Sequence, residues 1–515
     1  MQKQYISLGN KDVYNGEYLL AAYRVETYGG QSILEAASEM ASESSTGSNL
    51  TVGSATGFSK GLDALVYEVD EEKGFAYIAY PWRMFDQGGN IQNILTFIAG
   101  NLFGMGNLKA CKMEDVYFPS QMMSMYDGPS VSLEDLREYL QVYDRPILGT
   151  IIKPKIGLTT TEYAELCYDF WIGGGDFVKN DEPQANQDFA PFDKEVVAVR
   201  HAMDMAEDKT GRTKVHSFNI SAPDFDTMIQ RADHVRQVMK PGSYSFLVDG
   251  ITAGWMAIQT VRRRYPDVFL HFHRAGHAAF TRKENAFGFS VPVLTKFARL
   301  AGASGIHCGT AGVGKMDAGA VGLSEDVVAV HQCLKVEAQG HHFKQVWSKV
   351  PETDSDVQTM IKAEENLWNV GPLEVSRMRR EINKNDIHAV TAKADWRTVN
   401  RCTPIASGGM NPVLLADYIN AVGTIDFIIT MGAGVHSHPM KTTAGMKAVM
   451  EAFRAWQDGK TLEEAVKDKE GNDIELATAI RFYNEKGTQA HRIVQDVKPS
   501  EDKPSQDEPD APNKE

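Results

Sequence analysis

A lysine and two acids stand close together at Lys179, Asp181 and Glu182, directly after a short apolar run. This order predicts a buried strand that ends in one amine and two carboxylates. Two carboxylates so close repel each other unless a cation lies between them, and hard oxygen ligands of this kind suit Mg²⁺. The alternative is a solvated loop, which such a cluster usually forms when it stands alone. The apolar lead-in and the stop at Pro183 favour a fixed strand end.

The amine suits this cation site only in a modified state, because an ammonium would repel the metal. It fits if Lys179 loses its proton, or if CO₂ caps it as a carbamate and so adds a third anionic oxygen ligand. The stretch resembles the activation motif of ribulose-1,5-bisphosphate carboxylase/oxygenase (RuBisCO) large chains, most closely those of form II and archaeal form II/III. The resemblance implies that carbamylated Lys179, Asp181 and Glu182 bind Mg²⁺, with CO₂ as the carbamylating cofactor.

A second motif, Gly-Thr-Ile-Ile-Lys-Pro-Lys, places Lys153 and Lys155 after another β-rich run. Burial and neighbouring cations can lower the pKa of a lysine at a strand end and so suit it to proton transfer. The alternative is a surface turn, which the motif alone favours. The resemblance implies that both lysines line the active site and that Lys153 protonates the C2 carbanion late in the reaction.

A third motif holds three histidines and an arginine, His271, His273, Arg274 and His277. Three histidines at this spacing are compatible with a zinc site. Arg274 favours another function, because a buried guanidinium needs an anion such as phosphate or carboxylate. The resemblance implies that His273 lies near the metal and the substrate hydroxyls, that Arg274 holds one phosphate, and that His277 assists nearby.

The stretch Gly309–Lys315 fits the Gly-x-x-x-x-Gly-Lys pattern of a phosphate-binding Walker loop. That motif needs Ser or Thr at the next position to hold Mg²⁺, and Met316 stands there instead. The stretch resembles the mobile loop after the sixth barrel strand of RuBisCO. The resemblance implies that Lys315 reaches over the substrate and stabilises the carboxylate formed from CO₂, and that His307 binds the same phosphate as Arg274.

Two further glycine-rich segments contain Ser407, Gly408 and Gly409, and then Gly432 and Ala433. Each alone is compatible with an ordinary tight turn. After the seventh and eighth strands of a barrel, however, backbone amides of such segments close on a phosphate. Together with the arginine motif they predict two phosphate sites on opposite sides of the barrel mouth, and hence a bisphosphate substrate.

Two N-terminal segments carry Glu43, Ser48 and Asn49, and then Asn101. A Glu-Ser-Ser-Thr run is usually a helix cap. The resemblance implies instead that these residues complete the active site of a neighbouring subunit, with Glu43 meeting Lys315 and Asn101 touching the substrate near the metal. The minimal unit is then a homodimer with two shared sites. A higher homo-oligomer of dimers without a small subunit is expected.

Alternating strand-like and helix-like runs predict an α/β protein: a (β/α)₈ TIM barrel in residues 146–495 after an α+β N-terminal domain in residues 1–145. The predicted N-terminal elements are strands at 64–70 and 75–80 and helices at 34–42 and 92–99. The predicted barrel strands are 147–152, 176–178, 215–220, 245–248, 268–271, 305–307, 403–406 and 426–430. The predicted barrel helices are 160–171, 224–239 and 323–337. The barrel domain is expected to carry an insertion at 350–396 and C-terminal helices, followed by a disordered acidic tail at 496–515.

The composition is that of a globular protein, with 515 residues, 43% of them hydrophobic, and a net charge of −15. That charge disfavours nucleic acid and anionic membranes as partners. The five scattered cysteines predict reduced thiols in the cytoplasm, and we expect no signal peptide and no membrane span.

The expected activity is carboxylation of ribulose 1,5-bisphosphate by CO₂. It gives two 3-phosphoglycerate through a Mg²⁺-stabilised enediolate, for which O₂ competes. One alternative is a RuBisCO-like protein that only enolises or isomerises another sugar phosphate. Another is a scaffold or nucleotide binder without catalysis.

Overall fold

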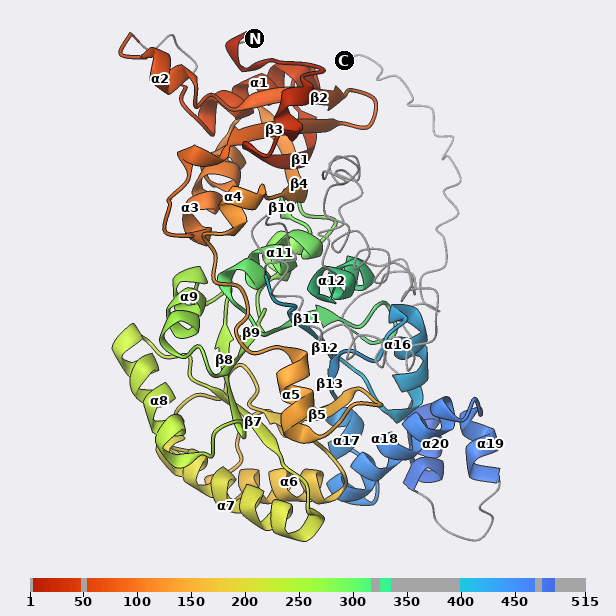
Figure 1. Cartoon of the computed structure of the whole chain (residues 1–515). Coiled ribbons are helices and arrows are strands. Elements are labelled where there is room, and N and C mark those ends of the chain that lie inside the picture. Colours follow the sequence, from red (N-terminus) through yellow and green to blue (C-terminus); the bar gives the residue numbers. More distant parts are fainter. Residues whose placement is uncertain (1–2, 48–52, 316–324, 335–398, 468–474, 487–515) are drawn as a thin grey trace, which may run out of the picture.

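Eight parallel strands close into a barrel in the computed structural model, which describes residues 3–47, 53–315, 325–334, 399–467 and 475–486 (Figure 1). Around the barrel the order is β11, β12, β13, β5, β6, β7, β8 and β9. Their bounds are β5 (Ile147–Ile151), β6 (Phe177–Lys179), β7 (Val215–Asn219), β8 (Tyr244–Asp249), β9 (Phe269–His273), β11 (Gly305–Gly309), β12 (Thr403–Ser407) and β13 (Ile428–Thr430). Each predicted barrel strand overlaps one of these, so the predicted barrel is confirmed.

A separate five-stranded sheet belongs to the N-terminal part of the chain and has the order β10, β4, β1, β3, β2. Its strands are β1 (Tyr18–Thr27), β2 (Leu65–Asp70), β3 (Phe75–Pro81), β4 (Leu108–Tyr117) and β10 (Phe287–Phe289). The two predicted strands are β2 and β3, whereas β1 and β4 were not singled out from the sequence. Strand β10 comes from the barrel part of the chain, between β9 and β11, and pairs in parallel with β4. It ties the barrel to the N-terminal sheet.

Helices surround the barrel and cover one side of the N-terminal sheet. The helices up to the sixth barrel strand are α1 (Ile33–Glu43), α2 (Gly57–Lys60), α3 (Ile91–Leu95), α4 (Ser120–Met123), α5 (Leu133–Leu140), α6 (Thr160–Ile172), α7 (Phe192–Thr210), α8 (Phe225–Val238), α9 (Trp255–Arg264), α10 (Ala278–Thr281) and α11 (Val291–Ala301). The later ones are α12 (Glu325–Leu334), α16 (Leu415–Val422), α17 (Ala433–His436), α18 (Lys441–Gln457), α19 (Leu462–Lys467) and α20 (Glu475–Lys486). Short 3-10 turns lie at Lys3–Tyr5, Lys11–Tyr14, Trp82–Met84, Asn101–Gly104 and Pro412–Leu414.

The helices predicted at 34–42, 160–171 and 224–239 correspond to α1, α6 and α8. The prediction of one helix over 92–99 was wrong in part, because α3 ends at Leu95 and a π-helical turn follows over Thr96–Gly100. The Thr96 hydroxyl donates to the Asn93 carbonyl at 2.7 Å, a local bond that competes with the regular helical ladder. Helix α12 lies within the predicted range 323–337, whose two ends fall outside the described residues.

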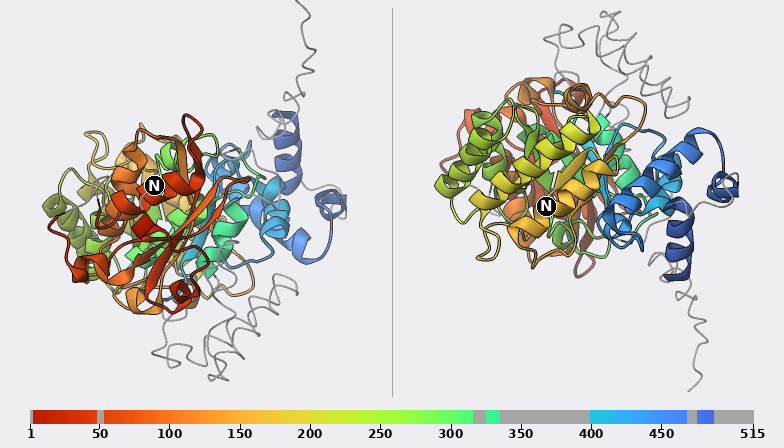
Figure 2. Two further views of the ribbon diagram at one scale, coloured as in Figure 1. Left: turned by 90° about the horizontal axis from the view of Figure 1, so that it is seen from above. Right: turned by 90° about the horizontal axis from the view of Figure 1, so that it is seen from below.

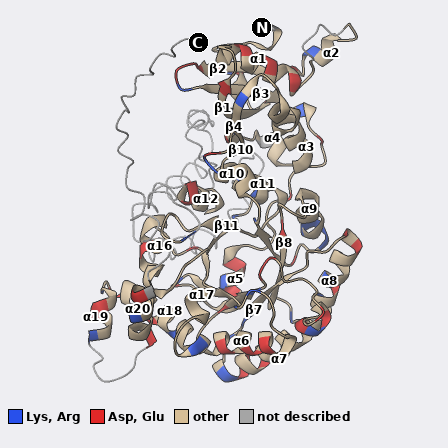
Figure 3. Cartoon of the chain, turned by 180° about the vertical axis from the view of Figure 1, so that it is seen from behind, with Lys and Arg blue, Asp and Glu red and all other residues tan. Residues whose placement is uncertain are grey.

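Charged side chains stand mainly on the outer helices, as Figure 3 shows, and the C-terminal helices lie together on one flank of the molecule in both views of Figure 2. The insertion predicted at 350–396 and the tail at 496–515 lie outside the described residues. In the described part of the chain, no helix is both long enough and apolar enough to cross a membrane.

The amino-terminal end of the barrel is closed by α5. This helix begins with a capping box, in which the Ser132 hydroxyl accepts from the Asp135 backbone and the Asp135 carboxylate accepts from the Ser132 backbone. Its apolar face packs into a cluster with the first residues of several barrel strands, Ile147 and Phe177 among them. Since this end is filled with apolar side chains, polar chemistry is left to the opposite, carboxyl-terminal end.

Candidate active site

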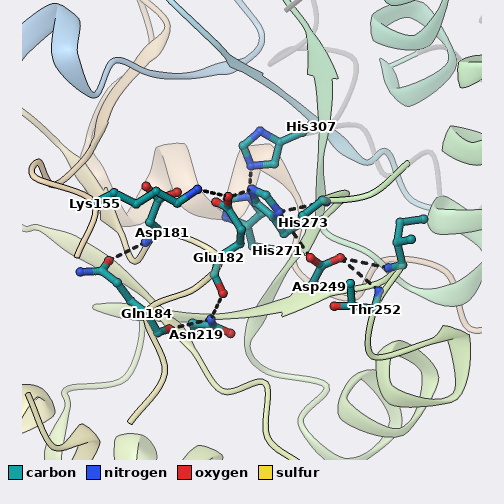
Figure 4. A network of polar contacts seen from close by, with 12 residues as sticks. Lys155, Asp181, Glu182, Gln184, Asn219, Asp249, Thr252, His271, His273 and His307 are labelled. Carbon is teal, nitrogen blue, oxygen red and sulfur yellow. Dashed lines mark hydrogen bonds and ion pairs between the residues drawn. The ribbon is translucent and has the colours of Figure 1, made fainter. Parts of the chain in front are cut away.

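The candidate residues of the barrel gather at the carboxyl ends of its strands. Lys179, His273 and Ser407 are the last residues of β6, β9 and β12, and His307 lies in β11. Parallel strands all point the same way, so their ends meet on one face of the barrel. Figure 4 shows the acids and histidines of this face turned toward one another.

Two lysines neutralise the two acids that follow β6. Lys153 Nζ lies 2.5 Å from Asp181 Oδ2, and Lys155 forms an ion pair with Glu182. Burial acts to raise the pKa of the Glu182 carboxyl, but hydrogen bonds, including the one from Lys155, outweigh it and hold that pKa below its ordinary range. Glu182 therefore carries negative charge at neutral pH, as a ligand of a divalent cation requires.

Lys179 is buried beside these acids, with 1% of its surface exposed. Burial lowers the pKa of its amine to about 8, against the opposing effect of Asp181 and Glu182. A sizeable share of the amine is thus unprotonated near neutral pH, and only the unprotonated form can add to CO₂. In the described part of the chain, no three His, Cys, Asp or Glu side chains are arranged to hold a metal ion. Asp181 and Glu182 supply the hard oxygen ligands that Mg²⁺ prefers, so these residues fit that cation.

Three histidines stand next to the acids, of which His271 and His307 are buried and His273 is partly buried. His271 Nε2 and His307 Nε2 are 2.8 Å apart, and His273 Nε2 lies 3.6 Å from Glu182 Oε2. Burial lowers the pKa of all three rings, and Lys179 lowers the pKa of His271 and His273 further. Neutral imidazoles result, which can each donate one hydrogen bond and accept another. On the far side of His273, Nδ1 lies 3.9 Å from Asp249 Oδ2.

Arg274 is buried with part of its hydrogen-bonding capacity unused. Its Nη2 lies 3.9 Å from Asp326 Oδ1, while its Nη1 has no hydrogen-bond partner among the described residues. Asp326 instead accepts from the backbone amides of Thr310 and Ala311, at 2.9 and 3.1 Å. A buried donor without a partner is costly, so this guanidinium is poised for an anionic ligand. His277 lies close by; burial, and then Arg274, lower its pKa to about 3.

The two glycine segments lie against Lys315 and Lys153, at the mouth of the barrel. The Lys315 amide donates to the Gly408 carbonyl at 3.0 Å, and a Cβ atom at Gly409 would come within 2.7 Å of Lys315 Cγ. A Cβ atom at Gly432 would come within 2.9 Å of Lys153 Cε. A side chain at Gly409 is disfavoured further by its positive φ of 83°, whereas at Gly432 the flexible end of Lys153 would have to shift. Ser407 lies at the head of the first segment, and Ala433 begins α17 just after Gly432.

Among the described residues, Glu43 and Asn101 form no hydrogen bond or ion pair with this cluster. Asn101 Nδ2 donates to Glu43 Oε1 at 3.1 Å, so these two residues contact each other. Glu43 ends α1, and Asn101 begins the 3-10 turn after α3 and the π-helical turn. Ser48 and Asn49 lie outside the described residues.

Sequence interpretation missed a polar layer behind the acids. Asn219 Nδ2 donates to the carbonyls of Glu182 and Gln184, and the Gln184 side chain accepts from the Asp181 amide at 2.6 Å (Figure 4). Asn180 and Gln184 stand in the same stretch as Lys179, Asp181 and Glu182, so the motif itself could have indicated these two residues.

The chain matches two family models. The model described as the ribulose bisphosphate carboxylase large chain, catalytic domain, covers residues 132–363 and 358–483. The model of the N-terminal domain of the same large chain covers residues 10–122. The chain belongs to the RuBisCO large-chain family. The family predicted from the sequence is thus confirmed.

Known RuBisCO proteins resemble this chain over nearly its whole length. A ribulose bisphosphate carboxylase of Rhodopseudomonas palustris strain BisB18 is 38% identical, over 88% of this chain and 89% of its own length. One from Rhodobacter capsulatus is 36% identical, over 92% of each chain. Among solved structures, a dimeric archaeal Rubisco from Hyperthermus butylicus has a TM-score of 0.75 at 31% identity, over 93% of this chain and 98% of that one. An octameric Rubisco from Pyrococcus horikoshii, with bound sulfate, also has a TM-score of 0.75, at 29% identity and over 94% and 97% of the two chains.

Proposed function

We propose that the chain is a ribulose-1,5-bisphosphate carboxylase, which combines the bisphosphate with CO₂ and water to give two 3-phosphoglycerate. O₂ competes with CO₂ for the same intermediate, which makes the protein an oxygenase as well. The observation that carries this proposal is the buried Lys179 beside Asp181 and Glu182 at the end of β6. Family membership and the relatives named ribulose bisphosphate carboxylase support it.

Activation begins at Lys179. Its unprotonated amine attacks CO₂, a nitrogen–carbon bond forms, and the proton released leaves a carbamate anion. The carbamate, Asp181 and Glu182 then form a set of three oxygen ligands suited to Mg²⁺. The cation, when bound, polarises the C2 carbonyl of the substrate. Lys153 and Lys155 must first release the two carboxylates that they neutralise in this structure.

The two phosphates of the substrate are held at opposite sides of the barrel mouth. Arg274 offers its unused Nη1 to one of them, with His307 and His277 beside it. The other phosphate meets the hydroxyl of Ser407 and the backbone amides of the glycine segments, at Gly408, Gly409, Gly432 and Ala433.

Catalysis uses the side chains between these phosphate sites. The carbamate oxygen on Lys179 removes the C3 proton and leaves an enediolate, while neutral His273 hydrogen-bonds the substrate hydroxyls. CO₂ adds at C2, and Lys315 stabilises the new carboxylate. Water adds at C3, the C2–C3 bond breaks, and Lys153 protonates the resulting C2 carbanion.

The active unit is a homodimer, in which Glu43, Ser48, Asn49 and Asn101 of one chain complete the site of the other. The contact between Glu43 and Asn101 supports this assignment, because it keeps the two segments together as one surface. Assemblies of such dimers, without a small subunit, are in line with the similar proteins described as dimeric and octameric. The five cysteines are free and buried, which supports a cytoplasmic location.

The decisive experiment follows labelled CO₂ into 3-phosphoglycerate, under anaerobic conditions, with ribulose 1,5-bisphosphate and Mg²⁺. The protein is first incubated either with or without bicarbonate. Label that depends on this incubation supports both the reaction and the carbamate. No label, from folded protein that still binds the bisphosphate, would contradict the proposal and point to an isomerase-type relative.

A further inference from the structure

The backbone that carries the two acids is held from behind by one buried side-chain amide. Asn180 Nδ2 donates to Glu195 Oε1 at 2.8 Å and to the Tyr163 hydroxyl at 3.0 Å. Asn180 Oδ1 accepts from the Asn219 backbone amide at 3.0 Å. Both donor hydrogens and the acceptor are thus used, and the side chain is 2% exposed. An amide that is saturated by partners from three elements, α6, α7 and β7, has a single allowed orientation.

The partners of this amide are themselves fixed. The Tyr163 hydroxyl lies 3.0 Å from His216 Nε2, and both residues are fully enclosed. Burial lowers the pKa of His216 to about 3, so the ring is neutral. His216 Nδ1 has no partner among the described residues. If Nδ1 carries the ring proton, Nε2 accepts from the Tyr163 hydroxyl. That hydroxyl is then free to accept from Asn180.

The same layer reaches the acids through Asn219. Its backbone amide binds Asn180, and its side chain donates to the carbonyls of Glu182 and Gln184 at 2.9 and 2.7 Å. Hydrogen bonds from groups that do not face the substrate therefore fix the segment from Asn180 to Gln184 at both of its ends. A carboxylate placed by a fixed backbone needs less reordering when it takes up a cation.

We propose that Asn180 is a positioning residue, whose amide, anchored by Glu195 and Tyr163, sets the affinity of Asp181 and Glu182 for a divalent cation. This inference rests on the proposed function. The proposed effect on cation affinity depends on the direction of the hydrogen bond to Glu195, in which the Asn180 amide is the donor.

Asn180→Asp is a sharp test because it keeps the size and the acceptor but turns both donors into acceptors. By electrostatics alone, an added negative charge next to Asp181 would tighten cation binding. The positioning role predicts the opposite, because the new carboxylate faces Glu195. Mn²⁺ serves as the probe, and the free ion is counted by electron paramagnetic resonance in the presence of bicarbonate and without bisphosphate. We expect Asn180→Asp to weaken Mn²⁺ binding roughly 10–100-fold, the usual size of such effects.

The double variant Asn180→Asp with Glu195→Gln restores a donor and an acceptor in exchanged places. The double variant should bind Mn²⁺ at least as tightly as the natural protein. Glu195→Gln alone should have nearly the same Mn²⁺ affinity as the natural protein. Asn420→Asp is the matched control: it makes the same chemical change at an exposed position of α16, where the side-chain oxygen accepts from Trp456 Nε1 at 3.0 Å. In all four variants (the two single changes, the double variant and Asn420→Asp), affinity for the bisphosphate in the absence of metal should be unchanged. A general loss of structure would lower this affinity as well.

Three results would overturn the inference: Asn180→Asp binds Mn²⁺ as tightly as the natural protein, the double variant fails to recover, or metal and bisphosphate affinities fall together. If Asn180→Asp does not fold, Tyr163→Phe replaces it. That change removes one acceptor of the amide, and we expect it to weaken Mn²⁺ binding about 2–10-fold; unchanged binding would count against the inference. If the natural protein shows no bicarbonate-dependent Mn²⁺ binding, the proposed function itself fails.

Discussion

Lys153, which is partly exposed, and buried Asp181, the first acid after β6, form an ion pair with 2.5 Å between Nζ and Oδ2. The Lys153 ammonium is thus paired with the same carboxylate to which the metal would bind. In the proposed activation, cation and lysine compete for Asp181, and Lys153 is released into the position from which it can reach the substrate.

Lys153→Met should separate metal binding from turnover. The change removes the competing ammonium, so Mn²⁺ affinity should be equal to or higher than that of the natural protein. Carboxylation should fall at least about 100-fold, because the proton donor is lost. Lys194→Met, on the exposed side of α7, is the control and should change neither quantity. A loss of Mn²⁺ binding in Lys153→Met would contradict the competition.

Lys179→Ala should abolish carboxylation and leave the fold intact. Lys179 is the side chain that carries the carbamate in the proposed function, whereas the change leaves Arg274 and the glycine segments untouched. Circular dichroism and bisphosphate binding report the fold, and labelled CO₂ reports turnover. Residual carboxylation above a few per cent would rule out the carbamate at this position.

Activation should depend on pH in the range around 8. The pKa of Lys179 is lowered to about 8, so the amine is neutral above that pH and is protonated as the pH falls. The initial rate of activation, at constant dissolved CO₂, should rise about tenfold per pH unit below 8 and level off above it. The protein is activated at each pH and then assayed at one common pH, so that turnover itself does not contribute. A rate of activation that is flat across this range would contradict the prediction.

Arg274→Lys should weaken bisphosphate binding. The lysine keeps the charge but loses the planar pair of donors, one of which is unused in this structure. A lost hydrogen bond to a charged group corresponds to about 10–100-fold in affinity. Calorimetry with the bisphosphate and with ribulose 5-phosphate measures the effect. Equal losses for both ligands would place Arg274 at the phosphate on C5, and a loss confined to the bisphosphate would place it at the phosphate on C1. Unchanged affinity for the bisphosphate would mean that Arg274 holds neither phosphate.

Deleting residues 350–396 should change the assembly more than the chemistry. The Arg299 side chain donates to the carbonyls of Gln332, Val399 and Asn400, at 2.8 to 3.0 Å. The two ends that flank the segment are thus held together by the barrel itself. We expect carboxylation per chain to be retained and the assembled mass, measured by light scattering, to fall. A variant with the native mass would show that the segment is not an interface.

The sequence alone indicated the barrel because its strands and helices alternate in short, regular runs. It also indicated Lys179, Asp181 and Glu182, because acids at a strand end have a local spacing that chemistry explains. Strand β10 had no such signal: Phe287–Phe289 is short, and its partner β4 lies far away in the sequence. At the break after Leu95, the Thr96 hydroxyl donates to the Asn93 carbonyl, a contact that hydrophobic periodicity does not reveal.

Which groups meet was decided only by the tertiary structure. Asn180 could be read off the motif, yet its partners Glu195, Tyr163 and Asn219 come from three elements that closure of the barrel brings to one place. The unused donor of Arg274 is likewise a property of its surroundings. Periodicity and composition record local preference and burial, which determine the elements. Pairing of donors with acceptors depends on distances across the fold, and those exist only once the chain has packed.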